Sequence, residues 1–142
     1  MDQLLSLLKT IPEYKPMVAA LQNGENVAVT GIGQMNRSHM IAALHSDTQA
    51  PIVILCQDDI AAKRLQEELA AFLGETAPIL PSREFTLYDS AVVSRGWEQK
   101  RLRQLFDLAT GKTSLQIMSW EAMSQRTIPK NTLLGTAFSL KL

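Results

Sequence analysis

An α/β fold, in which a parallel sheet is flanked by helices, is predicted by three features of the sequence. Apolar segments of strand length alternate with amphipathic segments of helix length through the middle of the chain. The run from Ile52 to Cys56 is continuously apolar and rich in β-branched residues, which is typical of a strand buried on both faces. A turn that contains Gly31 and Gly33 joins a short apolar segment to a helix, as nucleotide-binding loops do.

The composition is that of one soluble globular domain. The 142 residues are enough to bury a core. Fourteen basic residues balance fourteen acidic ones, so the net charge gives no indication of a nucleic-acid or membrane partner. One cysteine excludes an internal disulfide framework, and no segment approaches the roughly 18 apolar residues of a membrane span. Because the N-terminus also lacks the features of a signal peptide, a cytoplasmic protein without membrane contact is expected.

The expected elements alternate between helix and strand. Helices are expected over residues 4–8, 16–21, 37–45, 97–109 and 120–126. Strands are expected over residues 27–30, 52–56, 77–80 and 115–119, with 77–80 at an edge because of its proline. Asp58 or Asp59 begins a further amphipathic helix, which Gly74 ends. A long connection is expected over 81–96.

The C-terminal residues have a different pattern. From 132 to 142, apolar side chains alternate with small or polar ones, which predicts a half-buried strand of antiparallel type. This strand has no hairpin partner, so we expect it to lead into a missing module and to divide the chain into 1–131 and 132–142. An unpaired apolar strand also predicts self-association by pairing with a second copy.

The segment from Gly31 to Ser38 follows the spacing of a phosphate-binding loop, G-x-x-x-x-G-K-[ST]. Two of the positions that contact phosphate in this motif are occupied by other residues. Asn36 stands where the second glycine belongs and Arg37 where the lysine belongs, whereas Ser38 keeps the hydroxyl that would meet Mg²⁺. A side chain at position 36 hinders the approach of phosphate, and a planar guanidinium replaces a compact ammonium poorly. The loop, including Gly33, therefore predicts a P-loop NTPase-like fold with a degenerate nucleotide site. A small P-loop NTPase that tolerates Arg37 is the alternative.

Other polar residues give weaker indications of chemistry. Asp58 and Asp59 follow a buried strand, as a metal-positioning carboxylate would, but helix capping also explains them. His39 and His45 lack acidic or cysteine companions at ligand spacing, so no metal site is expected. No G-x-S-x-G nucleophile elbow occurs, and no catalytic residue is assigned.

A group of basic residues surrounds a tryptophan at the start of the helix expected over 97–109. Such a group could bind a nucleic acid by combining charge with aromatic stacking, or could contact a protein partner. A solvated helix face that happens to be basic is the simpler explanation. The residues are Arg95, Trp97, Lys100, Arg101 and Arg103.

The order of several short motifs resembles that of a known family. The motifs are Pro81-x-x-Glu84, Tyr88-Asp89, Ser94 and Arg101-Leu102-x-x-Leu105, and with the degenerate loop they cover nearly the whole chain. In this order they resemble the N-terminal, UvrB-like module of bacterial transcription-repair coupling factors, the Mfd family. The loop of UvrB binds ATP, whereas in the coupling factors it is degenerate, with an arginine at the lysine position as at Arg37.

The resemblance implies a helicase-type fold and a function in DNA repair. A coupling factor is an ATP-dependent DNA translocase of nucleotide excision repair, which displaces stalled RNA polymerase and recruits UvrA. Its ATP and Mg²⁺ belong to helicase domains further along the chain. The resemblance thus implies a non-catalytic scaffold without a cofactor of its own, whose parent protein binds UvrA, RNA polymerase and double-stranded DNA. An NTPase that uses residues 31–38 and a DNA-binding module that uses residues 95–103 remain as alternatives.

Overall fold

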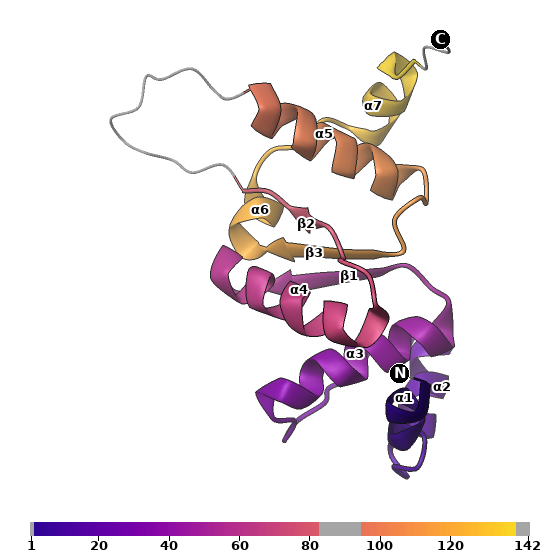
Figure 1. Ribbon diagram of the computed structural model, residues 1–142. Coiled ribbons are helices and arrows are strands. Elements are labelled where there is room, and N and C mark those ends of the chain that lie inside the picture. Colours follow the sequence, from indigo (N-terminus) through magenta and orange to yellow (C-terminus); the bar gives the residue numbers. More distant parts are fainter. Residues whose placement is uncertain (1, 83–94, 139–142) are drawn as a thin grey trace.

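The computed structural model describes residues 2–82 and 95–138, which contain a three-stranded parallel sheet (Figure 1). The strands are β1 (Ile52–Cys56), β2 (Ile79–Leu80) and β3 (Leu115–Ser119), in the spatial order β1-β3-β2. Ile54 of β1 and Ile79 of β2 both lie opposite Ile117 of β3. The predicted α/β class, its parallel sheet and the edge position of β2 are therefore confirmed.

Helices lie on both sides of the sheet. In Figure 1, α3 and α4 lie below the strands and α5 lies above them, while α1 and α2 pack on α3 and α7 lies beside α5. None of the described helices is both long and apolar enough to cross a membrane. The bounds are α1 (Asp2–Leu8), α2 (Tyr14–Gln22), α3 (Gln34–Thr48), α4 (Asp59–Leu73), α5 (Arg95–Ala109), α6 (Trp120–Ser124) and α7 (Lys130–Thr136).

The main hydrophobic core lies between the sheet and the helices α3 and α4. Leu69 of α4 and Ile117 of β3 are fully buried in it. Ala42 of α3 and Ala62 of α4 are also fully buried in this cluster, and their small side chains allow the two helices to approach closely. This packing holds the start of α3 near the carboxyl end of β1.

The two longer strands are buried to different extents. Every residue of β3 is buried, as expected for a central strand of a parallel sheet. In β1, Ile54 packs against the core, whereas Val53 and Leu55 on the opposite face are 52% and 45% exposed. The prediction of a strand buried on both faces is therefore wrong for residues 52–56. The reason is that β1 is an edge strand of the described sheet, and the described residues leave its second face uncovered.

The ends of α4 are those that the sequence predicts. Asp58 is the N-cap, and its Oδ1 accepts a hydrogen bond of 2.7 Å from the backbone N–H of Ala61. Gly74 follows the last turn with a φ of +74°, a left-handed conformation that glycine adopts without strain. Local capping chemistry thus fixes where this helix begins and ends.

Residues 27–30 do not form the predicted first strand. The whole segment is exposed, with Val27 and Val29 among its exposed apolar side chains, and no strand is present there. β-Branched residues form a strand only where a neighbouring strand offers backbone partners and a surface to pack against. In the part of the chain that the structure describes, the sheet consists of β1, β3 and β2, and residues 27–30 do not pair with the open edge of either outer strand.

The predicted C-terminal strand over 132–142 is also wrong, because residues 130–136 form α7. The backbone N–H of Leu133 donates to the carbonyl of Pro129 at 2.9 Å, and the hydroxyl of Thr136 donates to the carbonyl of Thr132 at 2.8 Å. Leu133 and its neighbour Leu134 are both half-buried, and α7 packs against α5. Two adjacent residues share a helix surface but not a strand face, so packing on α5 overrides the alternating pattern. Residues 139–142 lie outside the described residues.

Candidate functional site

The segment from Gly31 to Ser38 is a turn that leads directly into α3. Gly31 has a φ of +77°, a value that other residues adopt only with strain. Gly33 is the N-cap of α3, and its carbonyl accepts the backbone N–H of Asn36 at 2.9 Å. In a working phosphate loop the N–H groups of such a turn point at the ligand. Here the N–H of Asn36 is already used within the first turn of the helix.

The hydroxyl of Ser38 faces the protein interior. Ser38 is only 1% exposed, and its Oγ donates a hydrogen bond of 3.0 Å to Oε2 of Glu68 on α4. The residue that the loop pattern assigns to Mg²⁺ therefore connects two helices instead. Its position does not fit a metal-binding role.

Arg37 lines a cavity of about 620 Å³ at the carboxyl end of β1, where α/β proteins bind their ligands. The start of α3, which follows the loop, thus lines a cavity at the edge of the sheet where a nucleotide would be expected. The charged lining consists of Arg37 and Arg64 together with Asp58 and Glu68, so the two signs balance. A nucleoside triphosphate needs a surplus of positive charge, which the side chains of this lining do not provide.

The two aspartates after β1 are both engaged in structural contacts. Asp58 caps α4, which confirms the capping interpretation, and a carboxylate oxygen of Asp59 accepts a hydrogen bond from the hydroxyl of Ser82. Burial, and to a smaller extent the charge of Asp58, raises the pKa of the Cys56 thiol at the end of β1. A thiol with a raised pKa is a poor nucleophile at neutral pH. Cys56 is therefore not prepared to act as a nucleophile.

The histidines of α3 are also used for packing and polar contacts. The ring of His39 stacks on that of Phe72, with 5.0 Å between the centroids, and Nε2 of His45 lies 3.0 Å from Oγ of Ser114. Within residues 2–82 and 95–138, no three His, Cys, Asp or Glu residues come together to hold a metal ion.

The predicted basic group is divided by the structure, and Arg101 faces inward. It is 5% exposed, and its Nη1 and Nη2 donate to the carbonyls of Pro81 at 2.7 Å and Ala122 at 2.9 Å. Burial lowers the pKa of this guanidinium. The expectation that Arg101 belongs to a solvated basic face is therefore wrong, because its hydrogen bonds join the connection after β2 to α6.

The other members of the basic group differ in their surroundings. Arg103 forms an ion pair of 2.9 Å with Asp107, one turn further along α5, whereas Lys100 is exposed. The side chain of Arg95 lies outside the described residues. Among the side chains of this group that the structure describes, Lys100 and Arg103 are exposed and Arg101 is not, so Arg101 adds little to any cationic surface.

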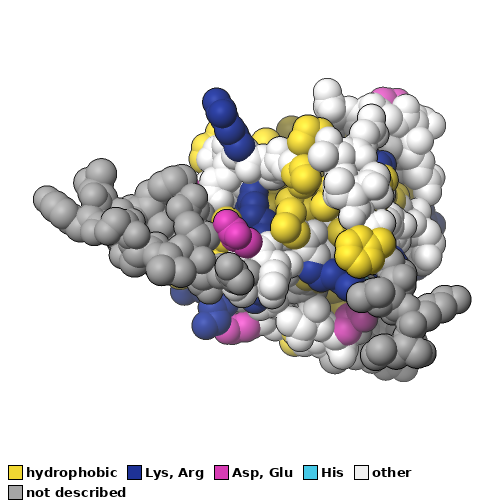
Figure 2. Space-filling view, turned by 90° about the horizontal axis from the view of Figure 1, so that it is seen from above, with side chains coloured by type: hydrophobic (Ala, Val, Ile, Leu, Met, Phe, Trp, Pro, Cys, Tyr) yellow, Lys and Arg dark blue, Asp and Glu magenta, His cyan; other side chains and the backbone are white. Residues whose placement is uncertain are grey.

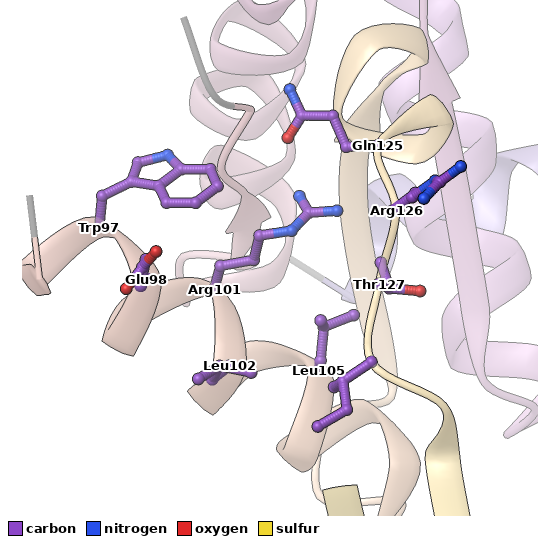
Figure 3. A pocket seen from close by; sticks show the side chains of 9 residues that line it. Trp97, Glu98, Arg101, Leu102, Leu105, Gln125, Arg126 and Thr127 are labelled. Carbon is purple, nitrogen blue, oxygen red and sulfur yellow. The ribbon is translucent and has the colours of Figure 1, made fainter. Parts of the chain in front are cut away.

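Trp97 and Arg101 line a second cavity, of about 550 Å³, between α5 and residues 125–128 (Figure 3). The indole N–H of Trp97 donates to the carbonyl of Ser82 at 2.7 Å, and the guanidinium of Arg101 lies 5.8 Å from the centroid of the indole ring. The sequence pointed to Trp97 and Arg101 but not to residues 125–128. No local signal could reveal those residues, because only tertiary packing brings them opposite α5.

Comparison with known proteins finds similarity to a transcription-repair-coupling factor. It is 28% identical over 124 residues to a transcription-repair-coupling factor of Myxococcus xanthus, a match that covers 82% of this chain. The chain spans about a tenth of the length of that relative, since the match covers 10% of it. No protein-family model matches the sequence. No solved structure matches it either. The similarity to a coupling factor agrees with the order of the motifs in the sequence.

Proposed function

We propose that this chain is the N-terminal, UvrB-like segment of a transcription-repair coupling factor and serves as a non-catalytic scaffold. The observation that carries the proposal is the identity of 28% over 124 residues to the Myxococcus xanthus protein. In this proposal the parent protein is an ATP-dependent DNA translocase of nucleotide excision repair. It displaces stalled RNA polymerase and recruits UvrA, and it binds ATP and Mg²⁺ in helicase domains outside this chain.

The contacts around the degenerate loop support the non-catalytic part of the proposal. Ser38 is hydrogen-bonded to Glu68, and Asp58 is the cap of α4. Both residue types that would position Mg²⁺ in an NTPase are thus engaged in holding α3 and α4 in place. The loop then acts as a connection that fixes the start of α3, and its shape matters more than its chemistry.

The role in repair is tested by strand-specific repair after ultraviolet irradiation. Deletion of the coding region for this chain from its parent gene should remove the faster repair of the transcribed strand, while repair of the non-transcribed strand continues. A matched strain with Arg37→Ala should repair both strands at wild-type rates, because the loop is proposed to have no chemical role. Unchanged preference for the transcribed strand after the deletion would overturn the proposal.

A calorimetric titration separates the scaffold from the NTPase alternative. Mg-ATP added to the chain at up to about 1 mM should give no binding isotherm, because Ser38 and the N–H of Asn36 are engaged within the protein. Arg37→Ala should give the same flat titration. Micromolar binding that disappears in Arg37→Ala would instead establish a working nucleotide site.

A further inference from the structure

Arg101 is a buried cation whose charge is not balanced by any carboxylate of the described residues. Its two hydrogen-bond partners, the carbonyls of Pro81 and Ala122, are neutral groups. Glu98 lines the same cavity but forms no ion pair with Arg101. Charged side chains are rarely buried without a partner of opposite charge, because dipoles replace their lost hydration only in part. A carboxylate brought into this cavity would therefore be bound favourably.

The remaining lining of the cavity is mainly apolar. Leu102, Leu105 and Ile128 contribute to it together with the ring of Trp97, and Leu102 is 43% exposed. Figure 3 shows the guanidinium of Arg101 reaching from α5 toward the segment that carries Thr127. Figure 2 shows hydrophobic side chains gathered in the middle of the upper face of the molecule, with Lys and Arg beside them. Apolar surface around a single charged anchor is typical of contacts between proteins.

The charges of the lining favour a peptide over a nucleic acid. Arg101 and Arg126 provide two positive charges, and Glu98 provides one negative charge. A nucleic-acid strand would bring a row of phosphates past Glu98, which repels them, and would leave the apolar lining unused. One carboxylate between apolar side chains matches both the single excess positive charge and the apolar lining.

We propose that the cavity between α5 and residues 125–128 binds a segment of a partner protein that presents one acidic side chain between two apolar ones. Arg101 receives the carboxylate, while Leu105 and Ile128 contact the apolar side chains. Arg126 adds attraction from the rim of the cavity. The inference depends on this cavity alone and holds whether or not the chain belongs to a coupling factor.

The proposal is tested by an NMR titration of the whole chain with a short synthetic peptide that has a central Leu-Glu-Leu. The indole N–H signal of Trp97 should shift on binding, and that of the exposed Trp120, outside the cavity, should not. A matched Leu-Gln-Leu peptide should bind at least about tenfold more weakly, because it lacks the charge that Arg101 attracts. Oligothymidylate is added in a third titration to represent a nucleic acid.

Two charge-introducing variants on the same helix provide the specificity control. Leu102→Glu places a carboxylate in the cavity lining and should abolish binding of the acidic peptide. Lys100→Glu makes a larger change in charge at an exposed residue outside the lining, and it should alter the affinity by less than about threefold. Both positions are exposed, so both variants should keep the fold, which circular dichroism checks.

Three results would overturn the proposal. The first is equal binding of the two peptides, and the second is an absence of any Trp97 shift with the acidic peptide. The third is a Trp97 shift at lower concentrations of oligothymidylate than of peptide, which would identify a nucleic-acid site instead.

Discussion

Arg101→Met should lower the free energy of unfolding by about 2–4 kcal/mol, because the carbonyls of Pro81 and Ala122 stay buried after their donors are removed. Methionine preserves most of the packing of the arginine stem, so the loss reports mainly on the hydrogen bonds. Relief of the buried charge opposes this loss but does not supply donors to the two carbonyls. Urea unfolding measures the effect as a lower midpoint at constant slope.

Arg103→Met is the matched control for Arg101, with the same substitution on the same helix. The Arg103 side chain is mostly exposed in its ion pair with Asp107, so its loss should change the free energy of unfolding by less than about 0.5 kcal/mol. Arg101→Lys should keep the charge but lose much of the stability, because one ammonium cannot bond both carbonyls as the guanidinium does. Equal effects of the two methionine variants would contradict a structural role for the inward-facing arginine.

Leu69→Ala should destabilise the chain by about 3–4 kcal/mol, the range for a fully buried leucine whose cavity does not collapse. Leu69 is in the cluster that joins α3, α4 and β3, and its side chain is completely enclosed. Domains of this size are stable by about 5–15 kcal/mol, so this one change removes a large share of the total. Thermal unfolding followed by circular dichroism measures the change.

Ile60→Ala is the control for the core substitution. Ile60 belongs to the same helix but is 79% exposed, so its truncation should change the free energy of unfolding by less than about 0.5 kcal/mol. A similar loss of unfolding free energy in both variants would mean that the buried face of α4 contributes no more to stability than its exposed face.

The elements that the sequence predicts correctly are those with strong local causes. Asp58 and Gly74 bound α4 through capping chemistry that needs no distant residue. The β3 strand is predicted at its observed bounds, and all of its residues are buried, the polar Gln116 and Ser119 included. Local capping and hydrophobicity are readable without knowledge of the tertiary fold.

The errors occur where distant partners decide the structure. Val27 and Val29 have the composition of a strand, but they do not join the described sheet and their side chains stay exposed. Leu133 and Leu134 belong to a helix because α7 packs on α5, a contact that the alternating pattern does not encode. Strand assignments depend on packing more than helix assignments do, and both errors are overestimates of strand.

The same distinction applies to the candidate sites: local features were predicted from the sequence, and contacts between distant residues were not. The altered residues of the loop can be recognised from spacing alone, and their degenerate chemistry follows from residue type. The engagement of Ser38 could not be predicted, because Glu68 lies on another helix thirty positions away. Arg101 was predicted on a solvated face because a basic residue on a helix is normally exposed. Its inward orientation depends on the connection after β2 and on α6.

The hydrogen bond between Ser38 and Glu68 affects how the loop could change in evolution. Glycine at position 36 and lysine at position 37 would complete the loop motif but would leave the hydroxyl of Ser38 bonded to Glu68 of α4. Freeing that hydroxyl would also require a change at Glu68, which would loosen the packing of α3 on α4. The complete loop motif is thus separated from the present sequence by substitutions on two helices that are unfavourable one at a time.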